Sequence, residues 1–245
     1  MGPNARLLIV SAFFLITANS ATAGLNDGLV AYYPFNGDAA DASGNGNDCT
    51  VVNAVPIADR HGTADRAYSF DGDGDYLDCG NDASLDLTGS LTLSLWIYTE
   101  NLASGRVLRK RSGTDGFEID VYDNQLRFSL NGSMRASWDL TAMEDTWIFV
   151  AAVLDTSLAQ FQAKLYVNQN DPDYSDFNDS LGSNTNPLYL GIWDPPNFVP
   201  FTGRMDSVRI YNRALSGAEI DRLYETVDNP PANVPTALTP LLLSD

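Results

Sequence analysis

The sequence predicts an all-β protein, an antiparallel β-sandwich with one short C-terminal helix. Short runs rich in β-branched and aromatic residues alternate with turns rich in Gly, Asn, Asp and Pro along most of the 245 residues. This spacing of strands and turns is typical of a sandwich. Only the stretch from Ser216 to Thr226 has a helical period. A sandwich of this length normally forms one domain, so we expect a single domain over residues 24–227.

Nine segments have the composition of strands, and one pair of them is joined by a two-residue turn. Asp123 and Asn124 form this turn, since Asp and Asn accept the left-handed conformation that tight hairpins require. The strands are expected, in chain order, over Leu29–Phe35, Tyr68–Phe70, Leu91–Tyr98, Phe117–Tyr122, Leu126–Leu130, Trp147–Asp155, Gln162–Val167, Leu188–Ile192 and Met205–Tyr211.

The last strand leads directly into the helix. Val208 and Ile210 point to one face of the strand, and the same alternation places Asp206 on that apolar face. A carboxylate there must be paired, hydrogen-bonded or bound to a cation. Ser216 followed by Glu219 forms a capping box, which predicts the first turn of the helix.

Both ends of the chain differ from the domain between them. Residues 1–23 have the pattern of a secretory signal: Arg6, then the apolar run Leu7–Ala18, then the small residues Ala21 to Ala23. We therefore expect a secreted protein, extracellular or periplasmic. The apolar run is too short to span a bilayer, and no other segment qualifies, so no transmembrane segment is expected. Residues 228–245 contain four prolines and predict a flexible tail.

The net charge and the cysteines limit which classes of function are possible for this protein. The formal net charge of −18 excludes nucleic acid as a partner, because binding it requires clustered Lys and Arg. Cys49 and Cys79 lie beside two further expected strands, over residues 49–52 and 75–79. In an exported chain a cysteine pair is more often oxidised than free, so Cys49 and Cys79 are expected to form a disulfide. Cysteine catalysis is unsupported, because the one histidine, His61, lies in a polar loop.

Three ordered segments resemble one family. Gly28–Asp48, Ala67–Tyr98 and Gly203–Ile220 are similar to the opening, central and closing parts of laminin-G-like domains in the concanavalin A-like lectin/glucanase superfamily. The resemblance covers roughly Leu25 to Tyr224. It implies a jelly-roll sandwich; family members bind carbohydrate or protein, so it leaves the ligand open.

The resemblance also implies a structural calcium ion. Such domains often hold a calcium ion between an early loop and the Asp of the last strand. At the matching positions of this sequence, the resemblance implies Asp41 and Asp206 as side-chain ligands. Asn45 and Asn47 are expected to contribute backbone or amide oxygens. Hard oxygen donors in a glycine-rich loop suit calcium. The alternative is an Asx-rich turn satisfied by its own backbone. Calcium is favoured because it also accounts for an inward-facing Asp206.

A catalytic alternative comes from the glucanase branch, whose carboxylates lie on a strand of the form Glu-x-Asp-x-Glu. Glu118 and Asp120 share one strand face. The third position holds Tyr122, and Asp123 beyond it falls in the turn, whereas retaining hydrolysis needs two carboxyl groups about 5 Å apart across the scissile bond. We favour an exposed polar strand face and assign no catalytic residue.

Two tryptophans are candidates for stacking on sugar rings, Trp138 and Trp193. Trp193 precedes two prolines, and a stiff turn lowers the ordering cost of binding. Core closure is the alternative for each ring. The expected function is a secreted, non-catalytic module that binds a polysaccharide or a cell-surface glycan or protein. The alternatives are a polysaccharide-active enzyme using Glu118 and Asp120, and an adhesive or structural module that binds protein.

Overall fold

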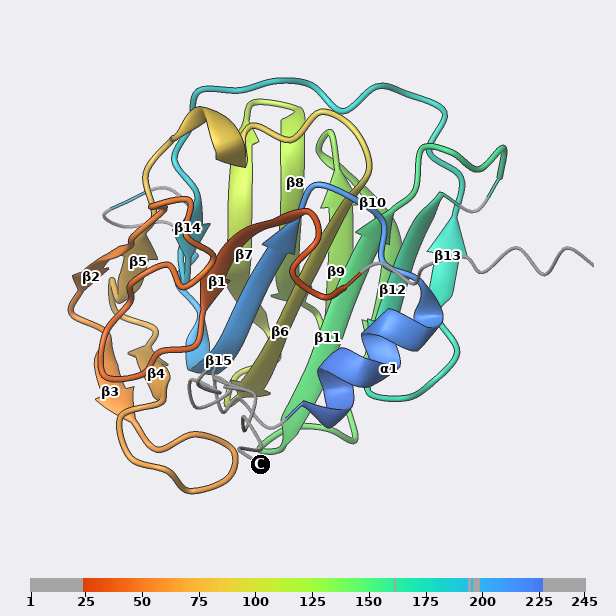
Figure 1. The fold of residues 1–245 in the computed structure, drawn as a ribbon. Helices are drawn as coiled ribbons and strands as arrows, with labels where there is room; N and C mark the ends of the chain where they lie inside the picture. The colour runs from red at the N-terminus through yellow and green to blue at the C-terminus, as the bar shows by residue number, and fades with distance from the viewer. Residues whose placement is uncertain (1–23, 161, 194, 196–198, 227–245) are drawn as a thin grey trace, which may run out of the picture.

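The computed structural model describes residues 24–160, 162–193, 195 and 199–226. Two antiparallel sheets pack face to face as a sandwich, and the short helix α1 (Gly217–Glu225) lies across the outer surface of one of them (Figure 1). The expected fold class is confirmed.

Sheet A, the eight-stranded sheet that carries α1, is organised around β15. Its order is β13-β12-β11-β6-β15-β4-β3, and β1 also pairs with β15. One edge of β15 is shared, because its first half pairs with β4 and its second half with β1, while β6 runs along the other edge. The strands are β1 (Leu29–Tyr33), β3 (Val55–Ile57), β4 (Ala67–Asp71), β6 (Leu91–Thr99), β11 (Trp147–Leu154), β12 (Ala163–Val167), β13 (Asp173–Ser175) and β15 (Thr202–Tyr211).

Sheet B, the seven-stranded sheet, lies behind sheet A in Figure 1 and has the order β10-β9-β8-β7-β14-β5-β2. One side of this sheet is a meander in which β7, β8, β9 and β10 follow one another in sequence and in space. The strands are β2 (Thr50–Val52), β5 (Tyr76–Asp78), β7 (Ser104–Ser112), β8 (Asp115–Tyr122), β9 (Gln125–Leu130), β10 (Ser133–Asp139) and β14 (Tyr189–Leu190). A single turn of 3₁₀ helix (Ala83–Leu85) precedes β6.

The core follows from the period of two in the strands. Phe117, Ile119 and Val121 of β8 are fully or almost fully buried in the main cluster between the sheets, so the alternate residues of β8 point to the outer face of sheet B. A smaller cluster on the outer face of sheet A, around Phe149 and Tyr211, is covered by α1. The outer face of sheet B has no such helix among the described residues.

The helix begins as expected. The Ser216 hydroxyl accepts a hydrogen bond from Glu219 N–H, and the Glu219 carboxylate accepts one from Ser216 N–H at 2.9 Å. Arg213 also donates to Glu219, at 2.7 Å. The hydrogen bond from Arg213, with those from Ser216, lowers the pKa of Glu219 to about 2.

A pH dependence of stability follows from Glu219. Its pKa is depressed in the folded state, so its stabilising contribution is complete above the ordinary value of 4.5 and is lost as the pH falls towards 2. Glu219→Gln removes this titration. We expect the free energy of unfolding of the variant, measured by urea titration, to fall less steeply than that of the parent between these two pH values. Identical slopes would contradict this assignment.

The disulfide is confirmed. Cys49 and Cys79, 30 residues apart in sequence, are bonded to each other. The bond ties the residue before β2 to the residue after β5, two strands that pair at the edge of sheet B.

Two strands of sheet B were not expected from the sequence, β7 and β10. In β7 the adjacent residues Val107 and Leu108 are both buried, because the register against β8 shifts between Arg106 and Leu108. This bulge breaks the alternation by which a strand is recognised. The segment of residues 168–186 is dense in Asp, Asn, Ser and Gly. It is nevertheless partly packed, since it contains β13 and buries Phe177 and Leu181 in the core.

No helix among the described residues combines the length and apolar character needed to cross a bilayer. The expected signal sequence, residues 1–23, and the Pro-rich tail, residues 228–245, lie outside the described residues.

Candidate functional site

The outer face of sheet B carries a connected set of arginines, carboxylates and aromatic rings, which we call the arginine–aromatic face. The bulge in β7 puts Arg106 directly opposite Asp120 and Arg109 directly opposite Glu118. On the other side of β8, Arg127 of β9 lies opposite Asp120. Residues directly opposite in an antiparallel pair share one face, so all of these side chains point outward. The face consists of Arg106, Arg109, Arg111, Glu118, Asp120, Tyr122, Arg127 and Trp193.

The two carboxylates of this face are buried and fully engaged by guanidinium groups. Glu118 Oε2 accepts from Arg109 Nη1 at 2.6 Å and from Arg111 Nη1 at 2.8 Å, and Glu118 Oε1 pairs with Arg106 Nε. Asp120 Oδ2 pairs with Arg106 Nη1 at 2.8 Å and with Arg127 Nη2, and Asp120 Oδ1 accepts from Arg127 Nε. Arg106 therefore bridges both carboxylates.

Positive charge is in excess on this face. Four guanidinium groups meet two carboxylates, which leaves a formal excess of two positive charges over β7, β8 and β9. Burial lowers the pKa of Arg109, and the neighbouring Arg111 and Arg106 lower it further, while Glu118 acts in the opposite direction. The guanidinium stays protonated in any case. Asp78, two strands beyond Arg109 on β5, accepts a hydrogen bond from Gly80 N–H.

Trp193 is held over this network by the chain that follows β14. Gly191 has a φ of 94°, and its N–H donates to Val107 O of β7 at 2.9 Å. On the returning segment Val199 O accepts from Arg106 N–H at 3.2 Å. Both sides of the loop are thus fastened to β7. The ring of Trp193 lies 4.8 Å from the Arg109 guanidinium and 5.1 Å from that of Arg106, yet the residue is 37% exposed.

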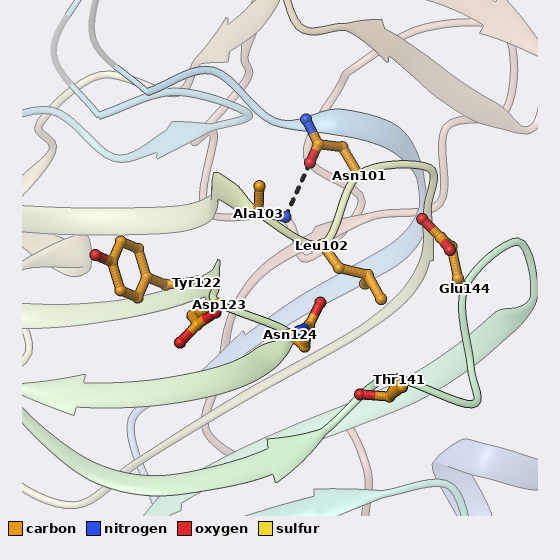
Figure 2. A pocket seen from close by; sticks show the side chains of 8 residues that line it. All are labelled: Asn101, Leu102, Ala103, Tyr122, Asp123, Asn124, Thr141 and Glu144. Carbon is orange, nitrogen blue, oxygen red and sulfur yellow. Dashed lines mark hydrogen bonds between the residues drawn. The ribbon is translucent and has the colours of Figure 1, made fainter.

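Tyr122 connects the face to a shallow, open hollow of about 670 Å³ (Figure 2). The Arg127 guanidinium lies 4.6 Å from the Tyr122 ring, which remains half-exposed. Carboxylate, amide and hydroxyl groups surround the hollow, an arrangement that suits hydrogen bonding to a neutral polyol. The lining residues are Asn101, Leu102, Ala103, Tyr122, Asp123, Asn124, Thr141 and Glu144.

The hairpin turn between β8 and β9 forms one wall of the hollow. Asp123 and Asn124 both have positive φ, 51° and 63°, as a two-residue hairpin turn requires. Asp123 N–H donates to Ala103 O and Asn124 N–H to Leu102 O, so this turn is fastened to the chain before β7. Figure 2 shows Glu144 across the hollow from Asp123.

The catalytic alternative finds no support in this geometry. Glu118 and Asp120 lie side by side on one face, as expected, but they are buried rather than exposed. Every carboxylate oxygen of the pair faces a guanidinium. Neither residue therefore offers a free oxygen to a sugar ring, and the pair acts as an anchor for the arginines.

The early loop proposed for calcium is satisfied by its own donors. Asp41 Oδ1 accepts from the N–H groups of Tyr32 and Ser43, and Oδ2 accepts from Asn47 N–H and the Ser43 hydroxyl. The Asn45 side-chain amide donates to Leu29 O and Val30 O, and the Asn47 amide donates to Val30 O. This is the Asx-rich turn that the sequence left as the alternative.

Asp206 does not lie on the apolar core face that the alternation predicted. Ser207 has a φ of 55°, and the register against β6 shifts between Asp206 and Arg209, so a bulge turns Asp206 to the outer face beside Trp96. There it pairs with Arg60, whose guanidinium also lies 4.6 Å from the Trp96 ring.

The four proposed ligands thus have protein partners: Asp206 pairs with Arg60, and Asp41, Asn45 and Asn47 are hydrogen-bonded within and around their loop. The described residues contain no group of three or more His, Cys, Asp or Glu side chains suited to a metal. Calcium binding stays a prediction; the thermal midpoint in calcium and in chelator would check it.

The two tryptophan candidates differ. Trp138 pairs opposite Leu126 and is packed, partly buried, against the main core, which is the core-closing role. Trp193 is the exposed ring described above. Sequence reasoning missed the four arginines, although one signal was present: Arg106, Arg109, Lys110 and Arg111 are four of only 14 basic residues in the chain.

Several solved structures with similar folds are binding domains. They include the binding domain of Paraclostridial Mosquitocidal Protein 1, with a TM-score of 0.64 and 18% identity, over 82% of this chain and 52% of that one. Another is the botulinum neurotoxin serotype D ligand binding domain in complex with N-acetylneuraminic acid, with a TM-score of 0.63 and 15% identity, over 82% and 51%. This chain spans about half the length of these toxin domains.

A third similar structure matches almost end to end. It is domain 4 of AbnA, a GH43 extracellular arabinanase from Geobacillus stearothermophilus, in complex with arabinotriose, with a TM-score of 0.61 and 20% identity, over 80% of this chain and 98% of that one. At such identities the likeness is one of fold. No curated protein sequence matches this chain. Residues 71–221, more than half of the chain, match the family model Laminin_G_3, and the chain therefore belongs to the concanavalin A-like lectin/glucanase superfamily.

Proposed function

We propose that this protein is a non-catalytic glycan-binding module whose ligand lies on the arginine–aromatic face and extends into the hollow beside Tyr122. The proposal rests on one observation, the exposure of the Trp193 ring together with its fixed contacts. Its ring is 37% exposed, yet it is held against Arg106 and Arg109, which are in turn anchored by the buried carboxylates of Glu118 and Asp120. A ring that is ordered before binding loses little entropy when a sugar stacks on it.

The surroundings of this ring fit a glycan. An aromatic platform beside polar groups suits a sugar, which has apolar C–H surfaces and many hydroxyls. Two structures of similar fold support the same class of ligand, since one was solved with N-acetylneuraminic acid and the other with arabinotriose.

Removal of the Trp193 ring tests the proposal. We expect Trp193→Ala to weaken binding by about tenfold or more, since stacked aromatic anchors commonly contribute more than about 1 kcal/mol. The measurement is affinity electrophoresis of residues 24–245 through gels containing different polysaccharides, followed by titration calorimetry with any glycan that retards the protein.

The matched control is Trp147→Ala, which removes the same side chain from sheet A, where Trp147 packs on Tyr98. Equal losses in the two variants would show that the Trp193 effect is not local to the site. If no glycan retards the parent protein, the proposal fails, and a protein partner becomes the hypothesis to test.

We also infer that the protein is exported. The Cys49–Cys79 disulfide is a bond that persists in oxidising compartments, and the sequence of residues 1–23 has the pattern of a secretory signal. Expression in a secreting host, with N-terminal sequencing of protein from the medium, checks this: cleavage near Gly24 is expected.

A further inference from the structure

We propose that the arginine–aromatic face selects glycans bearing a carboxylate group, so that the ligand is an acidic sugar flanked by neutral ones. This inference rests on the proposed glycan-binding function and names the chemical class of its ligand. The proposed binding of an anion contrasts with the formal net charge of the whole chain, −18, which repels anions.

The outer face of β7, β8 and β9 has an excess of positive charge. On the arginine–aromatic face four guanidinium groups meet two carboxylates, those of Glu118 and Asp120. Burial lowers the pKa of Arg109 most, Glu118 raises it, and the positive charges of Arg111 and Arg106 lower it further, so these arginines repel one another. A bound carboxylate relieves this repulsion, and it does so at a partly desolvated surface where charge pairs are stronger than in water.

The arginines also supply hydrogen-bond donors for a ligand. A guanidinium has five N–H donors in a fixed fork. Arg127 uses Nε and Nη2 on Asp120, and among the described residues no partner of Nη1 is found. The side chains of Arg127 and Arg111 are 25% and 19% exposed, so ligand atoms can reach both. The exposed ring of Tyr122 lies against Arg127, and that of Trp193 lies against Arg106 and Arg109 on the same face.

The surroundings of the arginines limit the ligand to isolated acidic groups. The hollow beyond Tyr122 is bordered by the carboxylates of Asp123 and Glu144, which repel a second anion and accept hydrogen bonds from hydroxyls. The negative charge of the whole chain also opposes dense polyanions, although screening at physiological salt confines that effect to about 8 Å. The acidic sugar therefore lies at the arginines, and neutral sugars lie towards the hollow.

The test compares oligosaccharides that differ only in charge. An immobilised array presents trisaccharides containing one uronic or one sialic acid, each as the free acid and as its methyl ester, together with neutral glycans. The ester keeps the ring and the carbonyl but removes the charge. We expect at least one free acid to bind about tenfold or more tightly than its ester at physiological salt, since hydrogen bonds to charged groups are worth more than neutral ones.

Two variants locate the effect. Arg127→Gln and, as a second substitution, Arg111→Gln each remove one of the more exposed guanidinium groups, and each should reduce the ratio of acid to ester affinity several-fold. The control is Arg204→Gln. Arg204 also pairs with a carboxylate, Glu100, and lies over a ring, Tyr98, but on sheet A, so the ratio should not change. Circular dichroism melting confirms that each variant is folded.

The outcomes separate the inference from the proposed function. Binding of free acids above esters, reduced by both variants on sheet B, supports the inference. Equal binding of acid and ester, or preference for neutral glycans, overturns the acidic selection while glycan binding stands. A ratio that falls equally in Arg204→Gln assigns the effect to overall charge and also overturns it. No binding to any glycan overturns both.

Discussion

Glu118→Gln is expected to lower the free energy of unfolding by about 3–5 kcal/mol, the range found when one partner of a buried ion pair is removed. Glu118 is 2% exposed and pairs with Arg106, Arg109 and Arg111. Glutamine keeps the shape of the side chain but removes its negative charge. Three partly buried guanidinium groups then lose the charge that balances them. Urea or thermal unfolding of the purified variant measures the change.

The matched control for this prediction is Glu100→Gln on sheet A. Glu100 also pairs with an arginine, Arg204, but both side chains are 39% exposed. Exposed pairs contribute about 0–1 kcal/mol, so the control should be close to the parent. Similar effects of the two substitutions would contradict the anchoring role of Glu118. A hydrolytic activity of the parent that Glu118→Gln abolishes would restore the catalytic alternative.

Replacing both cysteines of the Cys49–Cys79 bond by serine is expected to reduce the free energy of unfolding by about 3–4 kcal/mol. The bond spans 30 residues, and in the chain-entropy model closing a loop of that length restricts the unfolded chain by this amount. Because the bond joins the paired edge strands β2 and β5, the edge of sheet B should be the first region to lose amide-exchange protection.

A reductant provides the internal control for the disulfide. Added reductant should lower the denaturation midpoint of the parent to that of the double serine variant and leave the variant unchanged. If the parent and the variant unfold at the same denaturant concentration without reductant, the bond does not stabilise the fold.

Much of the fold can be predicted from short stretches of sequence, because interactions between nearby residues determine where strands, turns and the helix begin and end. The alternation of Phe117 to Val121 marks β8, Asp123 and Asn124 mark the hairpin turn, and Ser216 with Glu219 marks the helix start. In each case the deciding interaction lies within a few residues of the chain. The prediction fails where a bulge inserts one residue, as in β7 and at Ser207 of β15, because the side chains then change face without any change in composition.

The candidate site could be predicted only in part, since its members come from distant parts of the chain. Trp193 and the pair Glu118 and Asp120 were named as candidates, but the arginines that hold them were not. Arg106 reaches Asp120 only because β7 pairs with β8, and Trp193 reaches Arg109 only because the segment after β14 is fastened to β7.

The sequence alone therefore determined the sandwich class, the superfamily resemblance, the capped helix and the disulfide. The first three depend on local sequence patterns, and the disulfide depends on the chemistry of the two cysteines. The partners of the buried carboxylates, the outward position of Asp206 beside Arg60, and the satisfied state of the Asp41 loop depend on strand register and sheet packing. Register is a collective property of the folded sheet, because one shifted residue moves every later side chain to the opposite face.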